Sequence, residues 1–136
     1  MSKAVMISIH PKWCKKILSG EKTIEVRKTR PKLDTPFKCY IYCTQSGVAL
    51  GAWGKHGKVI GEFTCDRIYK IDKDSTGFLF KAGGLSVYKQ AAEEKCDLRV
   101  AMKDDELHGY LGHYQGHGWH ISNLKIYDTP KELIEF

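Results

Sequence analysis

The residues whose types and spacing best suit binding or catalysis are 20–27, which read Gly-Glu-Lys-Thr-Ile-Glu-Val-Arg. Within it, Lys22 and Arg27 supply cations that can bind phosphate or acceptor atoms, and Glu25 can accept from a base edge or an exocyclic amine. The same three side chains can also form an internal ion-pair network without any ligand, because such networks hold charges in structural roles too. The two interpretations are compatible, since Glu25 can hold Arg27 in place for a phosphate.

The net charge of the chain is concentrated around this segment. Residues 12–38 contain nine Lys or Arg against three Asp or Glu, and this excess equals the whole formal net charge of +6. So concentrated a positive field favours a polyanionic partner, most simply nucleic acid. A solvated lysine-rich face without a partner is the alternative. The basic residues expected to form a rim around the motif are Lys12, Lys15, Lys16, Lys28, Arg30 and Lys32.

Tryptophans are candidates for stacking on unpaired bases. Trp53 lies in a glycine-rich stretch, residues 45–58, where we expect a loop with this aromatic residue at its tip. Trp119 is a second candidate, although we expect a strand to hold it. Trp13 has helical spacing to other apolar residues, so we assign it to the core.

Neither the cysteines nor the histidines predict a metal site. On a strand, Cys39 and Cys43 would lie roughly 13 Å apart, too far to share one zinc ion. His117 and His120 are separated by residues that include a glycine, and no third ligand stands at a defined spacing. We therefore expect no metal and no cofactor. A histidine or lysine could still act as general acid or base in a ribonuclease, which needs neither.

Positioning of the motif depends on the elements around it. Residues 4–10 alternate like a half-buried strand, and Pro11 fixes the start of a helix that Gly20 ends. Residues 23–28 return to the strand period, with Glu25 and Arg27 on the polar side. The sequence thus predicts a strand–helix–strand unit with Lys22 in the turn before the second strand.

The rest of the chain predicts further strands and two short helices. One long strand, residues 58–71, changes phase near Asp66 and Arg67, which indicates a bulge, and its other face carries Glu62 and Thr64. We expect one α+β domain over residues 1–136, built on strands that surround a small barrel or a strongly bent sheet. The remaining predictions are a strand at 37–44, a connector at 73–84, helices at 86–96 and 104–111, and a strand at 121–127.

Composition bounds the class of protein. The chain has 136 residues, of which 42% are hydrophobic and 28% charged, as in ordinary soluble globular proteins. No run of about 20 apolar residues could span a bilayer, and the N-terminus lacks the features of a signal peptide. Five scattered cysteines suit buried thiols in a reducing compartment. We therefore expect a cytoplasmic protein that does not associate with membranes.

The motif at residues 20–27 resembles the GxKxxExR signature of the ASCH domain family, whose fold is a PUA-like β-barrel. The matching positions are Gly20, Lys22, Glu25 and Arg27. The preceding SIHPKWCKKILSG and the closing WHISNLKIYDTPKEL are also similar to small bacterial and phage-type members. The resemblance implies a small PUA-like barrel with flanking short helices, and a cleft beside the motif for a nucleobase or single-stranded nucleic acid.

Some small ASCH proteins hydrolyse N-acetylated cytidine with a Lys, a Thr three residues further on, and a Glu from a later strand. Lys22 matches the first position, and Glu62 is a plausible counterpart of the last. Glu25 occupies the position of the Thr, and a carboxylate is a far weaker nucleophile toward an amide. The resemblance therefore implies a related cleft more directly than this particular reaction.

We accordingly expect the protein to bind RNA, or a modified nucleobase or nucleotide, in a basic cleft beside the motif. The alternative is a hydrolase on the same cleft, an amidohydrolase of N-acylated cytidine or a ribonuclease, with Lys22, Glu25 and Glu62 as its catalytic candidates. An adaptor that meets another protein through the basic face is a third possibility, and the sequence specifies no such partner. The binding candidates are Lys22, Glu25, Arg27, Lys28, Arg30, Trp53 and Trp119.

Overall fold

The computed structural model describes residues 3–45, 55–74, 77–82, 85–86, 104–112 and 116–136. Strands dominate this part of the chain, and they belong to one seven-stranded sheet. The elements in chain order are β1 (Ala4–Ile9), α1 (Pro11–Leu18), β2 (Ile24–Arg27), β3 (Phe37–Cys43), β4 (Lys58–Asp74), β5 (Gly77–Ala82), β6 (Leu85–Ser86), α3 (Asp104–Leu111), β7 (Gly116–Lys131) and the 3₁₀ turn η1 (Leu133–Glu135).

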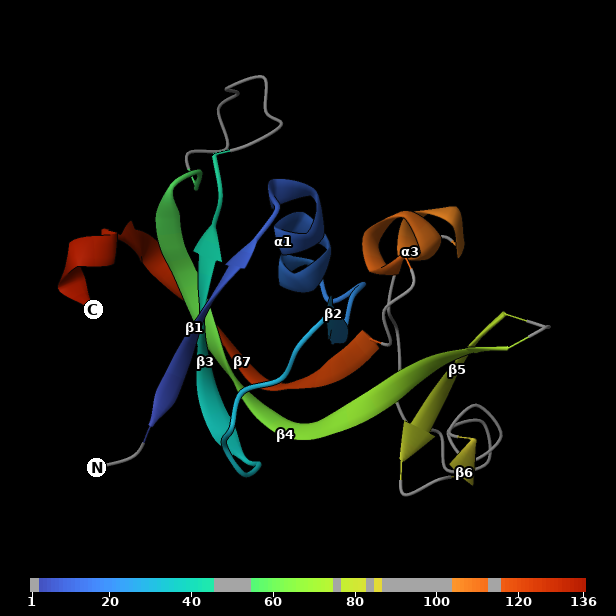
Figure 1. The fold of residues 1–136 in the computed structure, drawn as a ribbon. Coiled ribbons are helices and arrows are strands. Elements are labelled where there is room, and N and C mark those ends of the chain that lie inside the picture. The colour runs from blue at the N-terminus through green and yellow to red at the C-terminus, as the bar shows by residue number, and fades with distance from the viewer. Residues whose placement is uncertain (1–2, 46–54, 75–76, 83–84, 87–103, 113–115) are drawn as a thin grey trace.

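The long strands β4 and β7 organise the sheet. β4 pairs antiparallel with β3 along its first part and with β5 near its end, while β7 follows β4 over most of its length. β1 lies parallel to β3, and β2 pairs antiparallel with β7. Three register shifts between β4 and β7 bend the pair, and one of them, between Cys65 and Ile68, confirms the predicted bulge. Figure 1 shows the resulting curvature.

This curvature leaves the sheet open on one side. β1 pairs with β3, β2 pairs with β7, and among the described residues no ladder joins β1 to β2. The strand pairing therefore gives a strongly bent sheet, and it does not close into the barrel expected from the sequence. That residues 1–136 form one domain stays a prediction.

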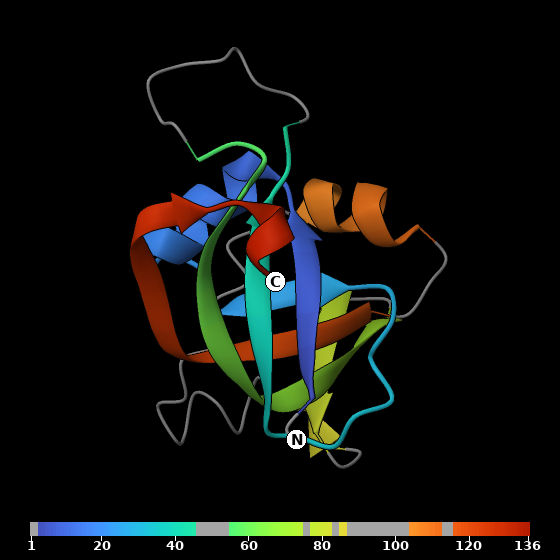
Figure 2. The same ribbon diagram turned by 90° about the vertical axis from the view of Figure 1, so that its left-hand side faces the viewer.

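The core fills the concave side of the bent sheet and the inner face of α1. Alternating residues of β3 are buried because the strand turns every second side chain inward, and α1 buries Cys14 and Ile17 against it. Two helices, α1 and α3, stand on the same side of β2 in both views (Figures 1 and 2). The core cluster consists of Ile7, Ile9, Cys14, Ile17, Phe37, Cys39, Ile41, Cys43, Ile60, Phe63, Cys65 and Trp119.

Two element predictions were wrong. The expected connector at 73–84 contains β5, which pairs with the end of β4 in an antiparallel hairpin. The last strand is longer than 121–127 because it begins at Gly116, where a Cβ would lie 3.0 Å from Leu111 and 3.3 Å from Ile71. Glycine at this position permits close packing within a strand, and so does not mark a loop. Ser86 ends a strand, and the rest of the helix predicted at 86–96 lies outside the described residues.

Candidate functional site

A cavity of about 260 Å³ lies at the open side of the sheet, between the end of β1 and β2. The two helices flank it, α1 through Trp13 and α3 through Tyr110. Four residues of the motif, Lys22 and residues 25–27, form part of its wall. The lining residues are 8–10, Trp13, Lys22, 25–27, Glu106 and Tyr110.

Lys22 reaches the cavity because of how α1 ends. The helix stops at Leu18, and Gly20 adopts a φ of +80°, a conformation that glycine tolerates best. The backbone N–H of Lys22 then donates to the carbonyl of Lys16 at 3.0 Å, which turns the chain back along the helix. As a result, the Lys22 side chain is only 2% exposed, and its ammonium lies 5.3 Å from the centre of the Trp13 ring.

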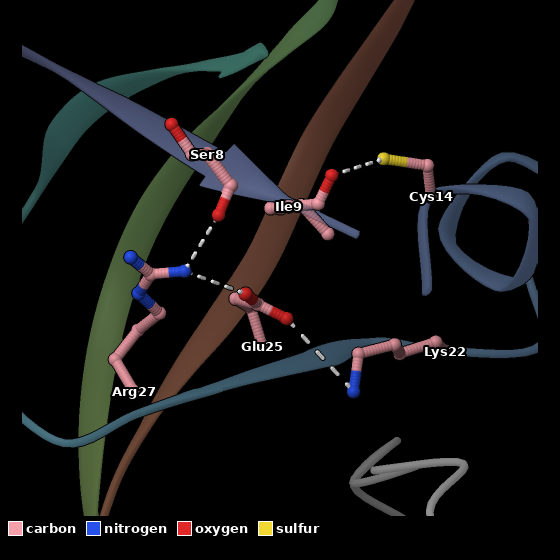
Figure 3. Close-up of polar contacts among 6 residues, drawn as sticks. All are labelled: Ser8, Ile9, Cys14, Lys22, Glu25 and Arg27. Carbon is pink, nitrogen blue, oxygen red and sulfur yellow. Dashed lines mark hydrogen bonds and ion pairs between the residues drawn. The ribbon is translucent and has the colours of Figure 1, made fainter. Parts of the chain in front are cut away.

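Glu25 is the centre of the charged network. It lies in β2, and its side chain is buried on the face opposite Ile24 and Val26. One carboxylate oxygen is 4.0 Å from the Lys22 ammonium, and the other accepts a hydrogen bond from Arg27 Nη1 at 3.3 Å. Figure 3 shows Glu25 between the two cations.

Arg27 connects β1 and β2, the two strands that are not paired with each other in the sheet. Its Nη1 donates to the backbone carbonyl of Ser8 in β1 at 2.9 Å while it also contacts Glu25 (Figure 3). The next residue, Ile9, accepts a hydrogen bond from the Cys14 thiol at 3.4 Å, which holds α1 against the end of β1. The guanidinium therefore bridges the opening between β1 and β2 through a side chain.

Burial controls the ionisation of this network. Desolvation lowers the pKa of Lys22 to about 8, although the Glu25 charge opposes the shift. Desolvation also raises the pKa of the Glu25 carboxyl, while Lys22 and Arg27 act in the opposite direction. Both shifts favour neutral forms, so Lys22 can exchange a proton near neutral pH, a property found often in functional sites.

Three lysine ammonium groups lie close to the indole ring of Trp13. Lys12 and Lys16 of α1 lie 4.8 and 5.2 Å from the ring centre, and Lys22 lies at 5.3 Å. Lys12 also forms an ion pair with Glu106 of α3. The helix α1 thus places two lysine ammonium groups near Trp13, and one of them pairs with the Glu106 carboxylate of α3.

α3 contributes the far wall of the cavity. Its Tyr110 lies beneath the Lys28 ammonium, 5.3 Å from the ring centre, and its hydroxyl is also within hydrogen-bonding reach of the Lys28 backbone. Burial raises the pKa of this hydroxyl. The neighbouring Leu111 is buried, which fixes the end of the helix.

The cavity residues that sequence reasoning missed are Ser8, His10, Glu106 and Tyr110, and Trp13 was assigned to the core alone. Trp13 does pack against the core cluster, but it also lines the cavity. The usable signal in the sequence was the pair Lys12 and Lys16, which lie close to Trp13 in the predicted helix. The helix containing Glu106 and Tyr110 was predicted, yet no local pattern related it to a motif some 80 residues earlier.

Glu62 is not among the residues that line the cavity with Lys22. It lies on the outer face of β4, where Lys38 approaches at 2.9 Å and the Tyr127 hydroxyl donates at 3.1 Å. The hydrogen bond from Lys38 is the main cause that lowers the pKa of this carboxyl. The sequence leaves open whether Glu62 reaches Lys22. In the structure Glu62 does not line the cavity, because successive residues of β4 face opposite sides and Phe63 takes the core side.

The predicted stacking residues are not among the cavity walls that the structure describes. Trp119 is 3% exposed and packs edge-to-face on Phe37, with ring centres 5.7 Å apart, so it is a core residue. Trp53 lies outside the described residues. Of the rim cations, Lys28 reaches the cavity wall through Tyr110, whereas Arg30 is exposed and does not line the cavity.

Within the described part of the chain, no group of three or more His, Cys, Asp or Glu is arranged to hold a metal ion. His120 instead approaches Asp66, with 2.7 Å between Nδ1 and the carboxylate oxygen. Cys39 and Cys43 are buried free thiols. Among the same residues, no helix is long and apolar enough to cross a membrane.

Comparison with known proteins gives a consistent family. A family model described as "ASCH domain" matches residues 7–102. No curated protein sequence matches the chain significantly. Among solved structures, the ASCH protein from Zymomonas mobilis matches with a TM-score of 0.62 and 19% identity, over 96% of this chain and 73% of that one.

Two variants of the Zymomonas mobilis protein match in the same way. A tyrosine-to-phenylalanine variant has a TM-score of 0.62 at 18% identity, covering 96% of this chain and 76% of that one. A serine-to-alanine variant has a TM-score of 0.61 at 19% identity, with coverages of 96% and 74%. At such identity the likeness concerns the fold alone.

Proposed function

This chain belongs to the ASCH domain family, and from that premise we propose that it binds a nucleobase or nucleotide, free or within RNA, in the cavity beside residues 20–27. We further interpret the bent sheet as a PUA-like barrel that stays open between β1 and β2, with the cavity at the opening. Lys22 and Arg27 would contact phosphate or acceptor atoms of the ligand, and Glu25 would orient them.

The burial of Lys22 and Glu25 in the wall of one cavity carries this proposal. Removing two charges from water is costly, and well-packed apolar side chains would often be as stable. Charges retained at such a cost beside a cavity are typical of binding and catalytic sites. The cavity volume of about 260 Å³ lies just below the usual range of small-molecule sites, about 300–1,000 Å³, which suits a ligand as small as a single base or nucleotide.

Titration calorimetry with nucleosides, nucleoside monophosphates and short single-stranded RNA tests the proposal. We expect Lys22→Met to weaken binding by about 10- to 100-fold, because the substitution keeps the volume but removes a buried charged donor. Lys125→Met is the matched control, since Lys125 is exposed on β7 and does not line the cavity. Absence of binding by the unmodified protein, or equal binding by both variants, would refute the proposal.

A hydrolase on the same cavity is the second candidate, favoured by the pKa of Lys22 near 8. An amine with this pKa has a substantial neutral fraction at physiological pH and can act as a general base. Its partner would be Glu25, at 4.0 Å, since Glu62 lies on the other face of the sheet. The reaction would be hydrolysis of an N-acylated cytidine or of an RNA phosphodiester.

Incubation with N-acylated cytidine and with labelled single-stranded RNA separates the enzyme from the binding module. For the enzyme we expect turnover that rises with pH toward a plateau above about 8, as Lys22 loses its proton, and that Lys22→Met abolishes. Unchanged turnover in Lys22→Met would exclude this mechanism. Ligand binding without turnover would leave the binding module as the function.

A further inference from the structure

One edge of the Arg27 guanidinium in the cavity wall has no protein partner. Nη1 makes both polar contacts of this side chain, donating to the Ser8 carbonyl at 2.9 Å and to the Glu25 carboxylate at 3.3 Å. In the part of the chain that the structure describes, Nε and Nη2 form no hydrogen bond. Figure 3 shows these two nitrogens on the side of the guanidinium away from Glu25. A ligand can therefore meet this edge without breaking the contact with Glu25.

The fold holds this edge in a fixed orientation. Nη1 contacts both β1 and β2, and only 28% of the Arg27 side chain is exposed. A guanidinium is planar and rigid, so once Nη1 is fixed the N–H groups of Nε and Nη2 point side by side in one plane. They form a fork that fits two neighbouring acceptors of one ligand. Because the fork is oriented before the ligand binds, little side-chain entropy is lost on binding.

His10 supplies a further donor, two residues after Ser8. It lines the cavity and caps the start of α1, because its Nδ1 accepts a hydrogen bond from the backbone N–H of Lys12 at 3.3 Å. The proton of the neutral ring therefore lies on Nε2, which has no hydrogen-bond partner among the described residues. Arg27 and His10 thus offer a ligand donors, so the ligand should present acceptors to them.

The other walls suit a planar, uncharged group better than a phosphate. Trp13 of α1 and Tyr110 of α3 contribute aromatic rings, and Ile9 and Val26 also line the cavity. A base can bury its flat faces against walls of this kind, whereas a phosphate would lose hydration there. An ionised Glu25, 3.3 Å from the same guanidinium, would also repel a second anion bound to it.

We propose that Arg27 determines base specificity: its Nε and Nη2 edge binds two neighbouring acceptors of one base, so that the cavity selects guanine or cytosine over adenine and uracil. This inference rests on the function proposed above, and it names the class of base. Guanine presents O6 and N7 side by side on its Hoogsteen edge, and cytosine presents N3 and O2 on its Watson–Crick edge. Adenine and uracil present no two neighbouring acceptors on these edges, so a donor of the base would face a donor of the guanidinium.

Calorimetry with the four nucleoside 5′-monophosphates tests this specificity. We expect the guanosine or the cytidine nucleotide to bind about 5- to 100-fold more tightly than the adenosine and uridine nucleotides, the range typical of one bidentate pair. Equal affinity for all four, or a preference for adenine or uracil, would refute the specificity while sustaining the proposed function. Absence of binding by any of these ligands would refute both.

Ligand analogues test the contact in the unmodified protein. The 7-deaza form of the guanosine nucleotide lacks N7, and the 3-deaza form of the cytidine nucleotide lacks N3. We expect the analogue of the preferred base to bind about 5- to 100-fold more weakly, which also identifies which of the two bases is bound. Ribose 5-phosphate has no base and should bind at least about tenfold more weakly than the preferred nucleotide. Full affinity of the deaza analogue, or of ribose 5-phosphate, would overturn base recognition by the guanidinium.

Arg27→Lys separates specificity from a structural role, because it keeps the positive charge and removes the fork. We expect the preference for guanine or cytosine to fall to about twofold or less, with little change for adenine and uracil. Arg67→Lys is the matched control and should keep the full preference, since Arg67 is exposed and does not line the cavity. A preference that persists in Arg27→Lys, including one with equal weakening of all four nucleotides, would contradict the proposal. The deaza analogues give their answer even if this variant is unstable.

Discussion

Lys22 is a residue whose environment, more than its type, determines its chemistry. The motif predicted a cation at this position, but its burial depends on the turn after α1 and on the ring of Trp13. Desolvation outweighs the nearby carboxylate, so the pKa falls from 10.5 to about 8. Such a balance is invisible in the sequence because it depends on the solvent accessibility of the folded chain.

This shift predicts a pH dependence of stability. Between pH 8 and 10.5 the unfolded chain holds a proton on Lys22 that the folded chain has released. The free energy of unfolding should therefore rise with pH across this window, by roughly 3 kcal/mol from this group alone. Urea unfolding from pH 7.5 to 10.5 measures it. The difference between the unmodified protein and Lys22→Met should show the rise, whereas Lys125→Met should follow the unmodified protein; parallel curves for all three would contradict the assignment.

The elements near the motif were predictable because local signals mark them. Pro11 and Gly20 bound α1, and the alternation of residues 4–10 and 23–28 corresponds to β1 and β2. Local signals did not predict the start of β7, because Gly116 permits close packing in a strand and does not mark a loop. They also did not predict β5, which forms a hairpin with the end of β4. The juxtaposition of α3 with the motif follows from the bending of β4 and β7, and short-range periodicity carries no information about it.

Replacing glycine by alanine should have opposite effects on stability at Gly61 and Gly109. Gly61 lies at a register shift between β4 and β7, where an added Cβ would be 2.6 Å from the carbonyl oxygen of Lys125. We expect Gly61→Ala to lower the free energy of unfolding by about 1–3 kcal/mol, because the clash is with backbone. Thermal and urea unfolding measure this.

Gly109 is the matched control. It lies within α3, and an added Cβ would meet nothing within 4 Å. Gly109→Ala should therefore leave stability unchanged or increase it by up to about 1 kcal/mol through helix propensity. A stable Gly61→Ala protein, or a strongly destabilised Gly109→Ala protein, would show that the packing described for these elements is wrong.

For the whole molecule, the distribution of charge decides how a polyanion approaches. The net charge of +6 arises from residues 12–38, which supply α1, β2 and the chain leading into β3. This much was evident from the sequence, because charge counts do not depend on folding. Its consequence is that the motif residues in the cavity wall belong to the most positively charged segment of the chain.

RNA binding should therefore weaken steeply with salt. If several phosphates are neutralised, the logarithm of affinity falls linearly with the logarithm of salt concentration, and each phosphate contact on a single strand adds about 0.7 to the slope. Fluorescence anisotropy between 50 and 300 mM salt measures this slope. Lys16→Gln should reduce it by about one contact, and Lys125→Met should not. A flat affinity across this range would contradict an electrostatic role for residues 12–38.

The opening between β1 and β2 has a consequence for the range of ligands. The helices α1 and α3 and paired strands frame the rest of the cavity. Between β1 and β2 of the described chain there is no ladder, and the Arg27 guanidinium donates to the Ser8 carbonyl across this opening. Moving β1 and β2 apart would break no backbone hydrogen bonds of a ladder between them in the described chain, so we expect the cavity to widen more easily here than between paired strands. If the cavity binds a ligand as proposed, a wider ligand would be accommodated by displacing the Arg27 side chain.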